Sequence, residues 1–200
     1  KEDWVVFGDD PDEGDYYIAV DLAGFADVAK ASNSKSKRLD TTAIAVVKAN
    51  TEGWFVEDII YGRWDIKKTA KKIFDAVDKY KPISVGIEKG ALKNAVLPYL
   101  TDLMKSNQRF FRVEELTHGN QKKIDRIVWA LQGRFENGQV TLNEGPWNTE
   151  FCDQLFQFPN PLVHDDLIDA LAYVDQLAKV SYYVDFDEED FEVLDPVSGY

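Results

Sequence analysis

The stretch Tyr16–Gly24 (YYIAVDLAG) starts as an unbroken run of aromatic and aliphatic residues and ends in one carboxylate followed by small residues. An apolar run of this kind predicts a strand that is buried on both faces. A lone charge is costly in such a strand, so Asp21, at its carboxyl end, has two interpretations. It is a site residue, because open α/β sheets bind ligands at the carboxyl ends of their strands, or it is a turn residue that caps the next loop.

The composition fits one packed domain without a membrane span. The chain has 200 residues, of which 44% are hydrophobic, and this is enough for a single core. No apolar run approaches the ~18–20 residues that a spanning helix requires, so we expect no membrane partner. The single cysteine, Cys152, excludes an internal disulfide framework and a cysteine-based zinc site, and it indicates a reducing compartment.

The acidity of the chain belongs to its two ends. The net charge is −13, but residues 1–15 hold seven acids against one base, and residues 181–200 hold seven acids and no base. Without these segments, 22 acidic and 22 basic residues remain of the 36 and 23 in the whole chain. We therefore expect an acidic lead-in over 1–15, one domain over 16–180 and a mobile acidic tail over 181–200. The tail either competes with a polyanion for a basic groove or serves solubility alone.

The order of predicted elements indicates a mixed sheet covered by helices. Three consecutive strands over 16–21, 41–48 and 54–64 predict an antiparallel meander. A long basic loop over 25–40 separates the first two, and it either contacts phosphates or is an ordinary insertion. Hydrophobic periodicity then predicts further strands over 83–88, 110–114 and 139–142, and helices over 65–80, 91–106 (bent or interrupted at Pro98), 121–136, 147–157 and 165–180. The fold class is therefore α/β, with a meander, added parallel strands and helices on both faces.

Carboxylates gather at three places in this pattern. Asp21 and Glu88 each end a hydrophobic strand, and neighbouring central strands would bring the two side chains together. The segment 163–172 (VHDDLIDALA) adds Asp165, Asp166 and Asp169, of which the last two lie three apart on one helix face. Acids in a first helical turn do suit the helix dipole. Three acids within five residues exceed what capping requires.

Clustered carboxylates repel one another unless a cation neutralises them. Hard oxygen ligands suit Mg²⁺ or Mn²⁺, and two such ions about 3.5–4 Å apart can activate water and stabilise the leaving oxygen of a phosphodiester. Asp21 would bridge the ions, and Glu88 and Asp166 would hold them from either side. Asp169 would be a further ligand or a supporting carboxylate. A glycosidase would need two acids of unlike pKa rather than such a cluster.

Residues around these acids are candidates for supporting roles. His164 and Asp165 adjoin Asp166 and could support the site, with His164 binding a metal or orienting a phosphate, although a cap or local hydrogen bond is the more common role of such a histidine. His118 is more simply a structural loop residue. Several bases could contact DNA phosphates or be ordinary solvated side chains, with Lys123 and Arg126 the strongest candidates: Lys89, Lys93, Lys122, Lys123, Arg126 and Arg134.

Several short motifs together carry a family resemblance. They are Asp21–Gly24, Gly86–Glu88, Lys123–Arg126 followed by Arg134–Val140, and Phe156–Pro159 before His164–Ala172. In this order and spacing, the sequence resembles the C-terminal nuclease domain of the large terminase subunit of tailed bacteriophages over residues 16–179. The last motif is also similar to the end of Holliday-junction resolvases, with Asp166 and Asp169 in register.

The resemblance implies an RNase H-like fold and a metal-dependent endonuclease that cuts concatemeric viral DNA during genome packaging. It implies double-stranded DNA as substrate, and a packaging ATPase module, the small terminase subunit and the portal as partners in the host bacterial cytoplasm. Two alternatives remain: a resolvase-like nuclease that prefers branched DNA, and a non-catalytic DNA-binding module of the same fold. Four costly acids at one site count against the second alternative.

Overall fold

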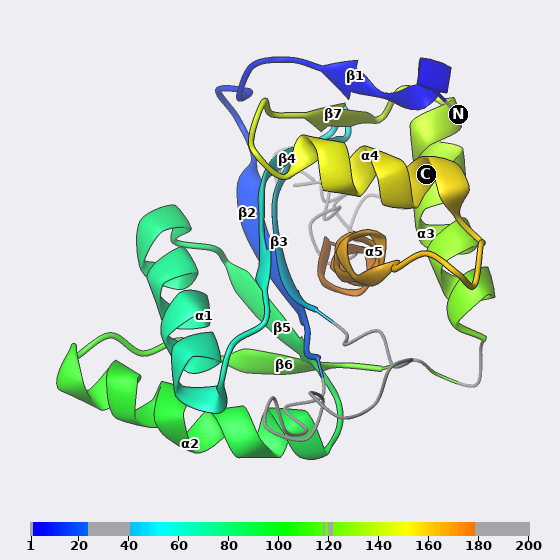
Figure 1. Ribbon diagram of the computed structural model, residues 1–200. Coiled ribbons are helices and arrows are strands. Elements are labelled where there is room, and N and C mark those ends of the chain that lie inside the picture. The colour runs from blue at the N-terminus through cyan, green and yellow to red at the C-terminus, as the bar shows by residue number, and fades with distance from the viewer. Residues whose placement is uncertain (1, 24–40, 118, 120–121, 179–200) are drawn as a thin grey trace, which may run out of the picture.

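The computed structural model describes residues 2–23, 41–117, 119 and 122–178, so the basic loop 25–40, His118 and the acidic tail 181–200 lie outside the described residues. Figure 1 shows a central sheet with helices on both sides. The strands are β1 (Val6–Phe7), β2 (Asp15–Asp21), β3 (Thr42–Ala49), β4 (Trp54–Gly62), β5 (Ser84–Glu88), β6 (Val113–Leu116) and β7 (Val140–Leu142). The helices are a 3₁₀ turn (Glu2–Trp4), α1 (Ile66–Tyr80), α2 (Ala91–Ser106), α3 (Lys123–Glu136), α4 (Asn148–Gln157) and α5 (Asp166–Ala178).

The seven strands form one mixed sheet in the order β1-β7-β4-β3-β2-β5-β6. The antiparallel meander β2–β3–β4 is as the sequence predicts. Strands β5 and β6 extend it in parallel beyond β2, and β7 and β1 extend it in parallel beyond β4. The predicted fold class is therefore confirmed. The short β1 shows that part of the expected lead-in, residues 6–7, pairs with the sheet edge.

The two faces of the central strands differ in side-chain size. Ile18 and Val20 of β2 point into the core beneath α1 and α2, as does Ile44 of β3. On the opposite face, the same two strands present the small residues Ala19, Ala43 and Ala45, all fully buried. Strand alternation produces this division, because successive side chains point to opposite faces of a sheet. The small face leaves room for a helix to approach the sheet closely.

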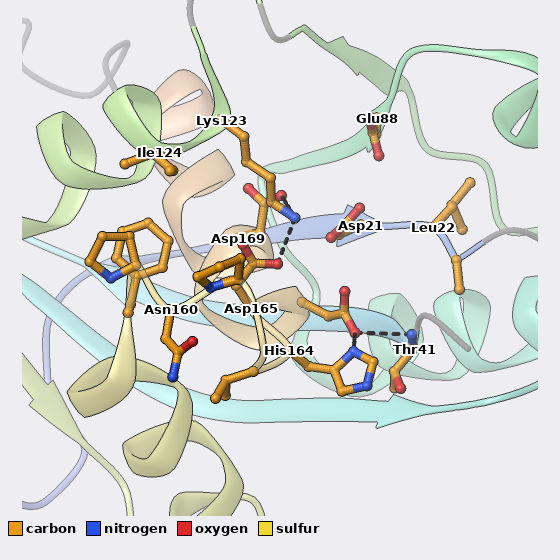
Figure 2. A pocket seen from close by; sticks show the side chains of 16 residues that line it. Asp21, Leu22, Thr41, Glu88, Lys123, Ile124, Asn160, His164, Asp165 and Asp169 are labelled. Atoms are coloured by element: carbon orange, nitrogen blue, oxygen red, sulfur yellow. Dashed lines mark hydrogen bonds and ion pairs between the residues drawn. The ribbon is translucent and has the colours of Figure 1, made fainter. Parts of the chain in front are cut away.

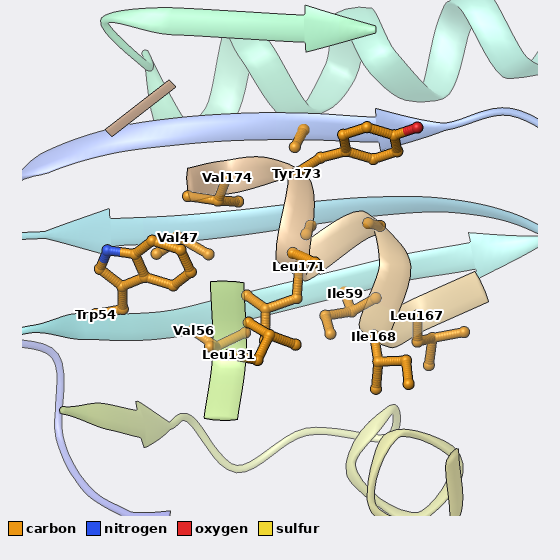
Figure 3. Close-up of a cluster of buried hydrophobic side chains, with 14 of the residues drawn as sticks. Val47, Trp54, Val56, Ile59, Leu131, Leu167, Ile168, Leu171, Tyr173 and Val174 are labelled. Atoms are coloured by element: carbon orange, nitrogen blue, oxygen red, sulfur yellow. The ribbon is translucent and has the colours of Figure 1, made fainter. Parts of the chain in front are cut away.

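Helix α5 occupies that small face. Eleven of its 13 residues are buried, and its apolar side chains share one core with β3, β4 and α3. Figure 3 shows Leu167, Ile168, Leu171 and Val174 of α5 among Val47, Trp54, Val56 and Ile59 of the meander. A helix that is apolar almost all round is typical of a fully enclosed position. Helices α3 and α4 lie outside α5 on the same side of the sheet (Figure 1).

Helix α2 is not interrupted at Pro98. It runs from Ala91 to Ser106 with Pro98 inside it. Pro98 is exposed, so the carbonyl that its missing N–H leaves unpaired can face solvent. Within the described residues, the other predicted boundaries lie within three residues of the observed ones, and several coincide with them.

We predict that enlarging the small face destabilises the protein. Ala45→Leu should lower the free energy of unfolding by about 1–3 kcal/mol, because extra methylenes in a packed core force neighbours apart. Urea unfolding followed by circular dichroism measures this. The control is Ala91→Leu, the same substitution at an exposed position, which should change stability by no more than about 0.5 kcal/mol. Equal effects of the two substitutions would contradict close packing of α5.

Candidate active site

Four predicted carboxylates come together at one open cleft. Asp21, Glu88, Asp166 and Asp169 all line a cleft of about 610 Å³, which lies where β2 and β5 end and α5 begins. Figure 2 shows Asp21, Glu88 and Asp169 pointing into the same space from three different elements. His164, Asp165 and Lys123 line the cleft as well, so every acid singled out from the sequence belongs to it.

Strand geometry accounts for the pairing of Asp21 with Glu88. Strands β2 and β5 are parallel neighbours, so their carboxyl ends meet at the same edge of the sheet. Asp21 shares the α5 side of β2 with Ala19, and Glu88 shares that side of β5 with Gly86, which packs against Leu116. The Glu88 carboxyl therefore lies close enough to Asp21 to contribute to the raised pKa of that group.

Burial and neighbouring charge disfavour the ionised form of Asp21. Its pKa is raised well above the usual value, first because burial desolvates the carboxylate, and then because Asp169 and Glu88 lie close by. Lys123 acts in the opposite direction and lowers that pKa. Any positive charge added near Asp21 would stabilise the ionised form of its carboxyl group.

The start of α5 is fixed by contacts from three other segments. The amide of Leu167 donates to Oε1 of Gln154 in α4, a buried side chain that satisfies one of the amides a helix start leaves unpaired. The amide of Thr41, just before β3, donates to Oδ2 of Asp166 at 3.0 Å. His164 Nδ1 lies 3.5 Å from the same oxygen. Sequence reasoning missed the Gln154 contact, because a lone glutamine in a helix has no distinctive pattern.

Two bases of α3 reach the acids of α5. Lys123 Nζ lies 2.8 Å from Asp165 Oδ1 and 2.9 Å from Asp169 Oδ2. The guanidinium of Arg126 pairs with the other oxygen of Asp169, Oδ1, and stacks 3.9 Å from the ring centre of Tyr173. Asp169 is only 3% exposed, so both oxygens of a buried carboxylate are compensated by cations from the neighbouring helix.

The predicted DNA-contacting bases fall into two groups. Arg126 is buried and Arg134 pairs with Asp175, so these two guanidinium groups bind acids of α5 within the protein. Lys93 is buried as well and pairs with Glu115. Lys89 and Lys122, by contrast, are exposed, and they adjoin the cleft residues Glu88 and Lys123 in sequence. A base in a helical pattern does not reveal whether it faces solvent or an acid of another helix.

The donor set has the chemistry of a divalent-metal site. The cleft offers carboxylate oxygens, which Mg²⁺ and Mn²⁺ prefer, and it includes a buried acid, Asp21, whose ionised form an added cation would stabilise. Within the described part of the chain, however, no three acids or histidines are already disposed around one point. Lys123 and Arg126 bind the two oxygens of Asp169, and the Thr41 amide binds Oδ2 of Asp166.

Comparison with known proteins places this cleft in a family. A model of the family described as "Terminase RNaseH-like domain" matches residues 18–175, which include all four carboxylates. The chain belongs to this family. No curated protein sequence matches it at a significant level. Across the described residues, no helix is long and apolar enough to cross a membrane.

Solved terminase structures share the fold at low sequence identity. The human cytomegalovirus terminase nuclease domain, soaked with Mn and bound to an inhibitor, is 15% identical, with a TM-score of 0.56 over 83% of this chain and 84% of that one. The large terminase nuclease of the thermophilic phage G20c with bound zinc is 14% identical, with a TM-score of 0.59 over 86% and 92% of the two chains. The large terminase of a second thermophilic bacteriophage is 9% identical, with a TM-score of 0.57 over 89% of this chain and 42% of that one.

These likenesses establish the RNase H-like terminase nuclease fold. The predicted recognition and fold class are therefore confirmed. The terminase nuclease domains of cytomegalovirus and G20c correspond to this chain over most of their length. The large terminase of the second thermophilic phage extends well beyond it.

We predict that Asp21→Asn stabilises the metal-free protein. The pKa of Asp21 is raised in the folded state above 3.8, the ordinary pKa of an aspartate. The native protein therefore loses stability as pH rises above that ordinary pKa. Asparagine lacks this penalty, so the variant's advantage should be small near pH 4 and grow toward about pH 8. Thermal unfolding in EDTA across this range measures it, and a pH-independent difference would contradict the raised pKa.

Proposed function

We propose that this chain is a divalent-metal-dependent endodeoxyribonuclease that cuts concatemeric viral DNA during genome packaging. One observation carries the proposal: carboxylates from two parallel strands and one buried helix converge on an open cleft in a chain of the terminase nuclease family. The Mn-soaked cytomegalovirus domain and the zinc-bound G20c nuclease support the use of divalent metals on this fold.

Asp21, Glu88 and Asp166 are the proposed catalytic metal ligands, and Asp169 is the fourth carboxylate of the site. Two Mg²⁺ or Mn²⁺ ions at these oxygens would supply the activation of water and the stabilisation of the leaving oxygen that phosphodiester hydrolysis requires. Asp21 is central to the proposed site because it lies near both Glu88 and Asp169. It is also buried, and this burial is the largest cause of its raised pKa. Ionised Asp21 is required for this role, so metal binding would release its proton.

The surrounding side chains hold these ligands in place. The Thr41 amide and His164 both contact Oδ2 of Asp166 and fix the orientation of that carboxylate. Arg126, stacked on Tyr173, fixes Asp169 from within the core. Asp165 keeps Lys123 at the cleft wall. Such supporting contacts matter because a displacement of about 1 Å at a reacting centre can cost a hundredfold in rate.

The proposed substrate is double-stranded DNA, bound through its phosphates. Lys89 and Lys122 are exposed beside the cleft and are the proposed phosphate contacts, whereas Arg126 and Arg134 are engaged inside the protein. We propose that the domain works with a packaging ATPase module, the small terminase subunit and the portal in the host bacterial cytoplasm. The large terminase of the second thermophilic phage has also been solved in complex with ADP, which supports a nucleotide-driven partner.

Plasmid cleavage tests the reaction class. The chain should nick and linearise supercoiled plasmid with Mn²⁺ or Mg²⁺ and not in EDTA. Asp21→Asn and Glu88→Gln should each reduce the rate by a factor of about 100 or more, because each removes a charged ligand from the site. Agarose gels at several times give the rates. Equal residual activity in both variants and the native chain would indicate a contaminating nuclease.

A four-way junction offered beside a linear duplex of the same sequence separates the terminase role from the resolvase alternative. A terminase nuclease should cut both at rates within a few-fold, whereas a resolvase should strongly prefer the junction. Binding of duplex without cleavage under either metal would favour the non-catalytic module.

The phosphate contacts predict a change in salt dependence. Lys89→Gln should weaken duplex binding to a similar extent for unrelated sequences, and should lower the slope of log K against log salt by about 0.9 for one lost phosphate contact. Fluorescence anisotropy in Ca²⁺, with salt varied, measures the slope. Arg134→Gln serves as control and should leave it unchanged, since Arg134 is already paired with Asp175. A slope altered equally by both substitutions would contradict a specific contact at Lys89.

A further inference from the structure

Lys123 occupies an unfavourable place in its own helix. It is the first residue of α3, directly after the N-cap residue Lys122, whose side chain makes no capping hydrogen bond. Positive charge at a helix N-terminus opposes the helix dipole, so two consecutive lysines there destabilise α3. The compensation comes from α5 and the residue before it, because Asp165 and Asp169 both bind Lys123. The position of Lys123 is therefore explained by the acids of the cleft rather than by α3.

The two cations on Asp169 are held very differently. Arg126 has a side chain only 7% exposed, lies on the ring of Tyr173 and cannot leave Oδ1 of Asp169 without disrupting the core. Lys123 is 40% exposed, lines the open cleft and bonds the other oxygen, Oδ2. Asp169 thus has one fixed cation on one oxygen and one displaceable cation on the other.

Lys123 can release Asp169 without losing its charge partner. Its second contact, Asp165 Oδ1 at 2.8 Å, lies in a side chain that is 30% exposed at the cleft wall. Rotation about the flexible lysine stem can keep that contact while Oδ2 of Asp169 is freed. The movement then breaks one of two ion pairs, and the ammonium remains beside the cleft, where a DNA phosphate would be bound.

Electrostatics connect this movement to the rest of the site. The charge of Lys123 acts on Asp21 against the repulsion from Asp169 and Glu88. It therefore does in the metal-free protein part of what a bound cation would do.

We propose that Lys123 is a displaceable counter-cation of the active site: its ammonium neutralises the acid cluster in the metal-free protein and releases Oδ2 of Asp169 when a divalent cation enters. The proposal rests on the metal-dependent function proposed above. Lys123 is thus a positioning residue that sets the metal affinity of the site and keeps the empty cluster folded. The pairing makes metal uptake at Oδ2 of Asp169 an exchange of partners, in which the metal takes the place of the Lys123 ammonium.

Metal binding without DNA tests this directly. Isothermal titration calorimetry with Mn²⁺ should give a Kd about tenfold lower for Lys123→Gln than for the native chain, since loss of an ion pair of moderate strength corresponds to a factor of about ten. Lys123→Arg, which retains the charge and can bind carboxylates through two N–H groups, should bind Mn²⁺ no more tightly than the native chain. This variant also keeps the test open if Lys123→Gln folds poorly.

Thermal unfolding supplies a second readout. In EDTA, Lys123→Gln should unfold several degrees below the native chain, and saturating Mn²⁺ should remove most of this difference. Two controls separate local from general effects. Lys122→Gln removes the adjacent charge, and Arg134→Gln breaks another α3–α5 ion pair away from the cleft. Neither should lower the Kd, and Arg134→Gln should destabilise the protein equally with and without Mn²⁺.

The outcomes distinguish the two proposals. Tighter Mn²⁺ binding by Lys123→Gln alone supports the counter-cation, even if the native chain binds too weakly to measure. Native affinity or weaker binding in Lys123→Gln, with Mn²⁺ bound by the native chain, overturns the counter-cation and leaves the metal-dependent function intact. No Mn²⁺ binding by the native chain or by any variant overturns both.

Discussion

The close approach of α5 to the central strands is the constraint on which the site depends. The buried alanines Ala19, Ala43 and Ala45 allow a helix with eleven buried residues to lie against β2 and β3. The first turn of that helix carries Asp166 and Asp169, and β2 ends in Asp21. The same packing that completes the hydrophobic core therefore forces acids together at its edge. Repulsion among these acids is the physical consequence, and it determines the role of the charged residues nearby.

Compensation of this charge takes two forms. Helix α3 supplies Lys123 and Arg126 to Asp169, and a third pair, Arg134 with Asp175, continues along the same helix interface. Asp21 and Glu88 instead lie beside each other at the strand ends, and burial together with its acidic neighbours raises the pKa of Asp21. Asp169 and Asp175 of α5 are thus compensated by direct ion pairs, whereas the ionised form of Asp21 is disfavoured. A cation bound at the proposed site would favour that ionised form.

The sequence predicted the fold and the acids well because both follow from local pattern. Alternation and apolar runs identified the strands, and Asp21 and Glu88 were predicted neighbours because each ends a buried strand. The roles of the bases could not be obtained in this way. Arg126 and Arg134 have the same helical spacing as exposed DNA contacts, and only the position of α5 shows that each faces an acid. The contacts of Gln154 and Thr41 join segments 13 and 125 residues apart in sequence, so no local signal announces them.

The distinction between Arg126 and Lys123 follows from their chemistry. Arginine remains charged when buried, and its planar group can both stack on Tyr173 and bind a carboxylate, so it suits a permanent position inside the core. Lysine is a compact charge on a flexible stem, and at 40% exposure it can move while its helix stays in place. Exchanging the two would place the immobile cation where the proposed metal would enter and the movable one where the core is closed. The order in which α3 presents them, lysine at its first residue and arginine one turn later, therefore matches a site that opens at its rim and is fixed at its base.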